Sequence, residues 1–140
     1  MTDKNRSITL DSTSIASLSR ACDAVHHWAS ITPSAPALSD ASRSLDYSQL
    51  AQAVEELATL ISGQGVLPGD RVLIVAENNI AAVVALFACQ RVNAWPAVVN
   101  ARLPAAELEG LQALVEPRLS LYAVEDSEAC EAQALSLIHI

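Results

Sequence analysis

The sequence is poor in basic residues. It contains a single lysine, Lys4, and its formal net charge at pH 7 is -8. Proteins that bind nucleic acids use clustered lysine and arginine side chains to neutralise phosphates. The arginines of this chain are instead scattered, at positions 6, 20, 43, 71, 91, 102 and 118. We therefore expect no nucleic-acid partner.

Glycine is also scarce, which limits the nucleotide-binding motifs that the chain can contain. The four glycines lie at positions 63, 65, 69 and 110, outside the connection Glu77-Asn78-Asn79 that follows the most apolar strand pattern. A dinucleotide-binding turn needs glycine there, because the backbone must approach the pyrophosphate closely. Walker-lysine, Gly-x-Ser-x-Gly and His-Glu-x-x-His motifs do not occur. We expect this connection to cap a helix rather than to bind phosphate.

Cysteines and long apolar runs are few as well. Cys22, Cys89 and Cys130 are odd in number and far apart, so the sequence predicts neither a disulfide framework nor a zinc site. The N-terminal segment lacks the apolar core of a secretion signal, and the most apolar run, residues 80–89, is too short to span a bilayer. We expect a soluble, cytoplasmic protein with a flexible segment at residues 1–13.

Helical periodicity is present in the first half of the chain. Apolar residues recur every three or four positions over residues 14–29, which predicts an amphipathic helix. Residues 37–46 are typical of two short strands around a polar turn. Asp46 and Gln49 then form a capping-box pattern, which predicts a helix that begins there and ends at Gly63 or Gly65.

Strand and helix patterns alternate in the second half. Residues 71–76, 95–99 and 118–123 are predicted strands. Between them lie a predicted helix over residues 79–93, capped by Asn78 or Asn79 and mostly buried, and a second helix from Pro104 to Pro117. The first strand is apolar without alternation, as expected for a strand buried on both faces of a parallel sheet. We predict an α/β fold, a three-layer parallel sheet flanked by helices, with this strand in the middle and a short β-hairpin near the N-terminus.

Two polar clusters invite a metal or acid–base interpretation. His26 and His27 are neighbours on a helix, where adjacent positions diverge by about 100°, so they cannot easily share one ion. We expect them on a solvated helix surface. Glu125, Asp126 and Glu128 lack further oxygen ligands at loop spacing, which favours a solvated turn. We therefore expect no catalytic, cofactor-binding or metal-binding residue in this chain.

A longer pattern covers residues 36–123. PALSDASRSLDYSQLAQAVEELATLISGQGVLPGDRVLIVAENN combines a hairpin, a helix that opens with Tyr-x-x-Leu and a Gly-Val-x-Pro-Gly-Asp-Arg-Val turn, and ALFACQRVNAWPAVVNARLPAAELEGL follows. This order resembles the N-terminal portion of AMP-forming acyl-CoA synthetases and related adenylate-forming enzymes. Asn93 stands where that family usually has glycine, and asparagine also tolerates a left-handed helix end. Gly69-Asp70-Arg71, Asn78 and Asn100-Ala-Arg102 match the family and look like turn and capping elements.

The resemblance implies a parent enzyme that activates a small carboxylic acid with ATP and Mg²⁺ and passes the acyl group to coenzyme A. The family's phosphate loop, its substrate pockets and its C-terminal lysine come after residues 14–134, which would form a partial AMP-binding domain. We expect this chain alone to be inactive. The acyl substrate stays open, as does the choice between coenzyme A and a carrier-protein thiol. The alternative function is a non-catalytic, stand-alone α/β interaction module.

The end of the chain, LSLIHI at residues 135–140, is similar to translated sequencing-adapter DNA. We expect an artefactual tail on a truncated reading frame there, the alternative being a native strand. An incomplete sheet and the apolar helix over residues 79–93 would expose apolar surface and an open strand edge. The fragment is therefore expected to self-associate.

Overall fold

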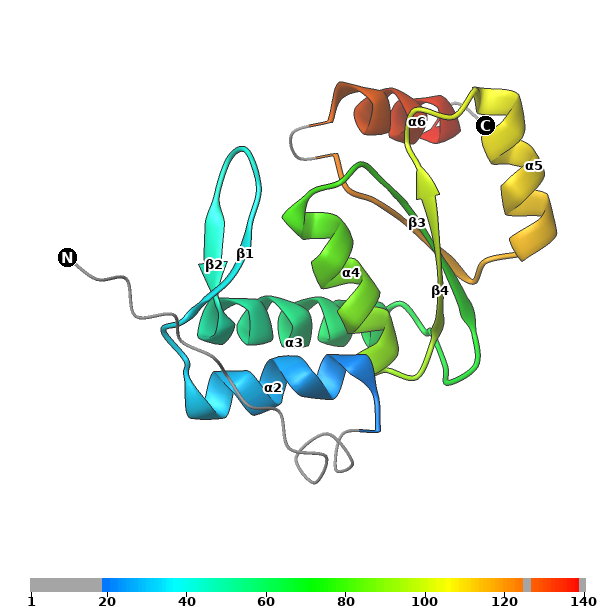
Figure 1. Ribbon diagram of the computed structural model, residues 1–140. Coiled ribbons are helices and arrows are strands. Elements are labelled where there is room, and N and C mark those ends of the chain that lie inside the picture. The colour runs from blue at the N-terminus through cyan, green and yellow to red at the C-terminus, as the bar shows by residue number, and fades with distance from the viewer. Residues whose placement is uncertain (1–18, 125–126, 139–140) are drawn as a thin grey trace.

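A computed structural model describes residues 19–124 and 127–138 (Figure 1). The strands are β1 (Pro36–Ser39), β2 (Ser44–Asp46), β3 (Arg71–Ala76), β4 (Trp95–Asn100) and β5 (Leu119–Tyr122). The helices are α2 (Ala21–Ile31), α3 (Tyr47–Gly63), α4 (Ile80–Arg91), α5 (Ala105–Val115) and α6 (Glu128–Ile138).

The main sheet has the strand order β4-β3-β5, and both pairings are parallel. Side chains that alternate along β3 pack on opposite faces of the sheet. On one face, Val72 and Ile74 join a core cluster with residues of α3 and α4. On the other face, Leu73 and Val75 pack with Leu108 of α5 and with α6. The three-layer α/β arrangement with β3 in the middle is therefore confirmed (Figure 1).

The hairpin and the helix after it follow the local sequence signals closely. Strands β1 and β2 pair antiparallel around the turn at residues 40–43. At the start of α3, Gln49 N donates to Asp46 Oδ1 over 2.7 Å, and Asp46 N donates to Gln49 Oε1 over 2.9 Å. This reciprocal capping box satisfies two N–H groups that the first turn leaves without a helical partner. The helix ends at Gly63, as predicted.

Helix α4 lies between α3 and the sheet and has no exposed residue from Ile80 to Arg91. Its composition, apolar on all sides, suits this position. Asn79 is its N-cap, because Asn79 Oδ1 accepts a hydrogen bond from Ala82 N over 3.0 Å. Of the two predicted caps, Asn79 is thus the one used, and Asn78 is exposed.

Several predicted boundaries differ from the structure. The first predicted helix, over residues 14–29, is observed as α2 from Ala21 to Ile31; Ser19 and Arg20 are not helical, and residues 14–18 lie outside the described residues. Pro104 is the N-cap of α5 and not part of its first turn. Its fixed φ of -54° and ψ of 143° put it in extended backbone just before the helix.

The C-terminal segment also differs from the sequence-based alternatives. Residues 128–138 are helical, so the alternative of a strand at residues 135–140 is wrong where the structure describes that segment. The periodicity of this segment is weak, and the helix is held by contacts with the sheet that only the fold supplies. Over the described ranges, no helix combines the length and apolar character needed to cross a membrane.

Two non-glycine residues adopt left-handed backbone, and both follow a helix. Asn93 has φ of 59°, as predicted from the family pattern, and Asn93 N donates to Gln90 O over 3.1 Å. Glu116 has φ of 48° at the end of α5. The sequence predicted that Pro117 ends this helix, but nothing in it indicated the left-handed residue. Proline disfavours right-handed helical backbone at the residue before it, so Glu116 cannot easily continue the helix. The left-handed residue just past α5 is a common way for a helix to end.

Replacing Asn93 tests the left-handed conformation. Valine at this position should lower the free energy of unfolding by about 1–2 kcal/mol, because its branched side chain clashes in left-handed backbone. Glycine should stay within about 0.5 kcal/mol of the native chain, since it loses only the hydrogen bond that Arg20 Nη1 donates to Asn93 Oδ1 over 3.1 Å. Urea unfolding of the two variants measures the difference, and equal midpoints would contradict the explanation.

Candidate functional site

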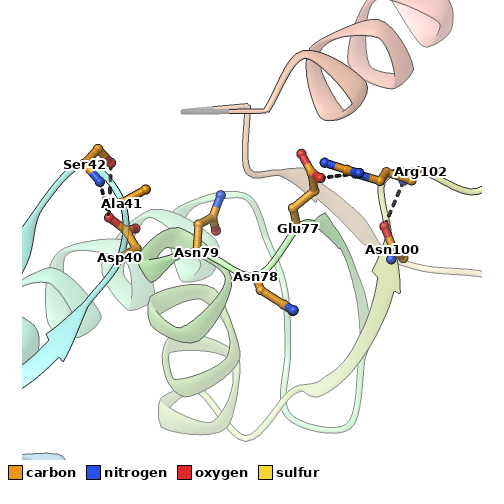
Figure 2. Close-up of a pocket in the computed structure, with 8 residues that line it drawn as sticks. All are labelled: Asp40, Ala41, Ser42, Glu77, Asn78, Asn79, Asn100 and Arg102. Carbon is orange, nitrogen blue, oxygen red and sulfur yellow. Dashed lines mark hydrogen bonds and ion pairs between the residues drawn. The ribbon is translucent and has the colours of Figure 1, made fainter.

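A polar crevice lies at the carboxyl ends of β3 and β4 (Figure 2). From these two adjacent strands the chain leaves toward opposite faces of the sheet, into α4 after β3 and into α5 after β4. Such a topological switch point is where open α/β sheets usually bind ligands. The crevice has a volume of about 460 Å³ and is lined by Asp40, Ala41, Ser42, Glu77, Asn78, Asn79, Asn100 and Arg102.

Asp40 connects the hairpin turn to the beginning of α4. Its Oδ2 accepts a hydrogen bond from Ile80 N over 2.9 Å, and its Oδ1 accepts from the backbone N–H groups of Ser42 and Arg43, each over 3.0 Å. The bond from Ile80, followed by those from Arg43 and Ser42, lowers the pKa of Asp40 to about 2. A carboxylate far away in the sequence therefore supplies part of the cap of α4.

The first turn of α4 has little capacity left for an anion. Ile80 N donates to Asp40, and Ala82 N donates to Asn79. Backbone N–H groups at a helix start bind phosphate only where protein side chains do not already occupy them. This geometry confirms the sequence-based expectation that the connection after β3 caps a helix.

On the opposite wall of the crevice, Glu77 pairs with Arg102. The Arg102 Nε group donates to Glu77 Oε1, and Ser127 Oγ donates to Glu77 Oε2 over 2.5 Å. The hydrogen bond from Ser127, followed by that from Arg102, holds the pKa of Glu77 below its usual value. Arg102 N also donates to Asn100 Oδ1 over 2.9 Å, which makes residues 100–102 a side-chain-closed turn.

The two other matched elements, Gly69-Asp70-Arg71 and Asn78, lie apart from each other. Gly69 has φ of 88°, a conformation that glycine adopts readily, and Gly69 N donates to Asn93 O over 2.9 Å. Asp70 Oδ2 accepts from Leu67 N over 2.8 Å, so this segment is a turn before β3, at the amino end of the sheet. Asn78 lies at the carboxyl end and lines the crevice (Figure 2).

Neither ATP nor Mg²⁺ fits the residues that line this crevice. Among the described residues that line it, Arg102 is the only cationic side chain, and Glu77 already pairs with it, while Asp40 adds a second negative charge. A triphosphate needs converging backbone donors, cationic side chains or a bound metal ion. In the part of the chain that the structure describes, no three His, Cys, Asp or Glu side chains are placed to hold a metal ion.

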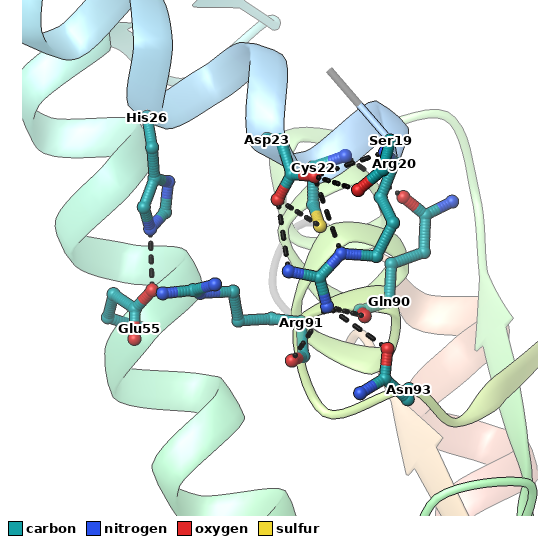
Figure 3. A network of polar contacts seen from close by, with 9 residues as sticks. All are labelled: Ser19, Arg20, Cys22, Asp23, His26, Glu55, Gln90, Arg91 and Asn93. Carbon is teal, nitrogen blue, oxygen red and sulfur yellow. Dashed lines mark hydrogen bonds and ion pairs between the residues drawn. The ribbon is translucent and has the colours of Figure 1, made fainter. Parts of the chain in front are cut away.

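The histidine pair occupies a different place from the one predicted. His26 is half-buried between α2 and α3, and its Nε2 lies 2.5 Å from Glu55 Oε1 (Figure 3). Arg91 at the end of α4 pairs with the same carboxylate. The hydrogen bond from Arg91, followed by that from His26, lowers the pKa of Glu55. The expectation of a solvated surface histidine is wrong for His26, which helps to join three helices.

The other sequence candidates that the structure describes, His27 and Glu128, lie apart from each other. His27 is half-buried, and its ring packs edge-on against Trp28 at 5.2 Å between centroids. Glu128 is exposed at the start of α6, and Glu125 and Asp126 lie outside the described residues. Asp40 and Glu77 were not singled out from the sequence. The position of Glu77 directly after a predicted buried strand is a signal that could have identified it, whereas no local pattern marks Asp40.

The pKa of Asp40 leads to a pH-dependent prediction. Since its folded-state pKa of about 2 is below the ordinary value of about 3.9, its stabilising contribution is present above pH 4 and lost as pH falls toward 2. In Asp40→Asn this contribution is absent, so the free energy of unfolding should decline less over that window. Urea unfolding from pH 5 to pH 2.5 tests it, with the exposed Glu107→Gln as control. A native-like decline in Asp40→Asn would contradict the assignment.

The sequence of this chain is similar to the sequences of known enzymes. A profile of the family described as AMP-binding enzyme matches residues 25–139. The chain is 36% identical over 106 residues to AMB antimetabolite synthetase AmbE of Pseudomonas aeruginosa, covering 76% of this chain and 5% of that protein. It is 37% identical over 87 residues to 3-oxocholest-4-en-26-oate--CoA ligase of Rhodococcus rhodochrous, covering 62% of this chain and 16% of the ligase.

The fold matches solved structures as well. VinN in complex with L-aspartate superimposes with a TM-score of 0.73 at 20% identity, over 82% of this chain and 32% of that chain. At this identity the likeness establishes the fold, an N-terminal subdomain arrangement. The profile match covers most of the chain, and the curated relatives are ligases and synthetases far longer than 140 residues. The chain therefore belongs to the AMP-binding enzyme family, whose members are adenylate-forming ligases.

Proposed function

We propose that this chain is the N-terminal part of an ATP-dependent acid–CoA ligase. In the whole enzyme, the carboxylate of the substrate attacks ATP to give an acyl-adenylate and pyrophosphate. The thiol of coenzyme A then displaces AMP to give the thioester. Adenylation is needed because a carboxylate is a poor electrophile without a leaving group. Family membership carries the proposal, and the name of the Rhodococcus relative, a CoA ligase, supports this acceptor.

The role of the present residues is structural support. The crevice has one cation, two carboxylates and a capped helix start, which is a poor combination for a triphosphate. We infer that ATP, Mg²⁺ and coenzyme A are bound by parts of the parent enzyme other than residues 19–138. The buried sheet would then serve as the base on which those parts are assembled.

The alternative, a stand-alone interaction module without nucleotide chemistry, is disfavoured by the match to a family of AMP-binding enzymes. Genomic DNA beyond the codon for Ile140 separates the two functions. A continuing reading frame that encodes a loop rich in glycine, serine and threonine, with a lysine, supports the ligase. We also propose a cytoplasmic location, since the three cysteines are free and buried, which suits a reducing compartment.

Purified chain should neither form an acyl-adenylate nor bind Mg²⁺-ATP. The physical reason is the lack of converging donors and cations, together with a net charge of -8 that repels phosphate. Pyrophosphate exchange with a panel of fatty, aromatic and amino acids, with a vector-only preparation as control, measures the first activity. Calorimetric titration measures the second. Acid-dependent exchange above the control would overturn the proposal that other parts of the parent enzyme bind ATP.

Self-association of the isolated chain is a separate part of the proposal. Strand β4 is an edge of the described sheet, and its Trp95 and Val98 side chains are 69% and 53% exposed. An apolar edge strand offers unpaired N–H and C=O groups to another chain. A lysine at such an edge disfavours pairing because its charge would be buried.

Val98→Lys should therefore lower the average mass in sedimentation velocity toward that of the monomer. Leu114→Lys is the matched control, because Leu114 is 80% exposed and belongs to a helix, α5, not to a strand edge. Both variants are compared with the native chain over a concentration series under reducing conditions. A sharp, concentration-independent monomer for the native chain would contradict self-association, and equal effects of both variants would contradict the role of β4.

A further inference from the structure

The carboxylate of Glu77 joins three segments that are far apart in the sequence. Glu77 itself follows β3, Arg102 lies between β4 and α5, and Ser127 precedes α6. Each of the two carboxylate oxygens accepts a hydrogen bond from one of these partners. Ser127 is 5% exposed, whereas the Arg102 side chain is 75% exposed. The inner bond is thus shielded from water and the outer one is open to it.

Ser127 has a second role, at the start of α6. Its Oγ accepts a hydrogen bond from Cys130 N over 3.0 Å, which makes Ser127 the side-chain cap of that helix. The hydroxyl therefore links the Cys130 N–H group of α6 to Glu77. Because the same oxygen donates to Glu77 and accepts from Cys130, the orientation of the first turn of α6 depends on where the Glu77 carboxylate lies.

Two further hydrogen bonds attach α6 to the sheet side of the molecule through neutral groups. Cys130 Sγ donates to Val75 O over 3.0 Å, and Gln133 Nε2 donates to Leu103 O over 2.9 Å. Cys130 also belongs to the core cluster on this face of the sheet and is fully buried. Its thiol is consequently a sensitive reporter, since it stays protected only while α6 remains packed on β3.

Glu77 and Arg102 also stand between two hollows. Both residues line the crevice of about 460 Å³ at the switch point and a second space of about 750 Å³ bordered by α6. The other charged residues that line these spaces are Asp40 on the crevice side and Glu128 on the α6 side. Arg102 is therefore the only cation that faces Glu77 in the described lining, and the pair forms the partition.

We propose that Glu77 is the positioning residue of the carboxyl edge: it fixes α6 on the sheet through Ser127 and at the same time holds Arg102 on the wall of the crevice beside it. Movement of α6 and movement of Arg102 are thereby coupled. When the carboxylate is lost, α6 separates from the edge and the two hollows join. Glu77 thereby closes the crevice on its α6 side, whatever reaction the whole enzyme carries out.

Thiol labelling of the full chain tests this proposal. Cys22, Cys89 and Cys130 are all fully buried, so each reports on a different part of the fold. The native chain and Glu77→Ala are treated with N-ethylmaleimide under native conditions, and the labelled cysteine is identified by peptide mass spectrometry. In Glu77→Ala, Cys130 should react about tenfold faster through local opening, while Cys22 and Cys89 keep their native rates. Glu109→Ala, at an exposed position of α5, is the matched control.

A set of Ser127 variants separates positioning from simple loss of stability. Ser127→Ala removes both the donor to Glu77 and the cap of α6. The Glu77→Ala/Ser127→Ala double variant should therefore label no faster than Ser127→Ala alone, because the contact with Glu77 is already absent in that variant. Ser127→Asn keeps a hydrogen-bond donor for Glu77 and an oxygen that can cap α6. Compared with Ser127→Ala, it should restore the protection of Cys130. Equal acceleration at all three cysteines, native protection in Glu77→Ala, or additive effects in the double variant would each overturn the proposal.

Discussion

Burial of β3 on both faces is the constraint on which the rest of the structure depends. Its residues from Val72 to Ala76 are at most 4% exposed. A strand can be buried in this way only if helices cover the sheet on both sides, and parallel neighbours require crossover helices to supply that cover. The helix pair α3 and α4 on one face, and α5 with α6 on the other, follow from this requirement.

The same constraint accounts for the polar crevice. Because the chain leaves β3 and β4 toward opposite faces, the residues just after these strands end beside an opening and not beneath a helix. Glu77, Asn78, Asn100 and Arg102 collect there for this reason. The crevice is therefore a product of topology. Its chemistry is set by the side chains at those positions, and most of them bind one another or cap backbone.

Local signals explain why much of the fold could be predicted from the sequence. The capping box of Asp46 and Gln49 and the unalternating apolar strand each depend on neighbours within a few residues, whereas the left-handed Asn93 was predicted from the family resemblance. The features that were missed depend on contacts between distant segments. Asp40 is 40 positions from Ile80, and Glu55 meets His26 and Arg91 only after three helices have packed. No pattern along the chain encodes such pairings, so only the folded structure reveals them.

The two strands that pair with β3 are separated from it by different lengths of chain. Val72 pairs with Pro96 in β4 and with Leu119 in β5, positions 24 and 47 residues further along. The entropic cost of bringing chain segments together rises with the length of the intervening loop. The β3-α4-β4 unit is thus the less costly one to form, and it provides the surface on which β5 adds. This favours a folding order in which the switch-point edge between β3 and β4 exists before the third strand is in place.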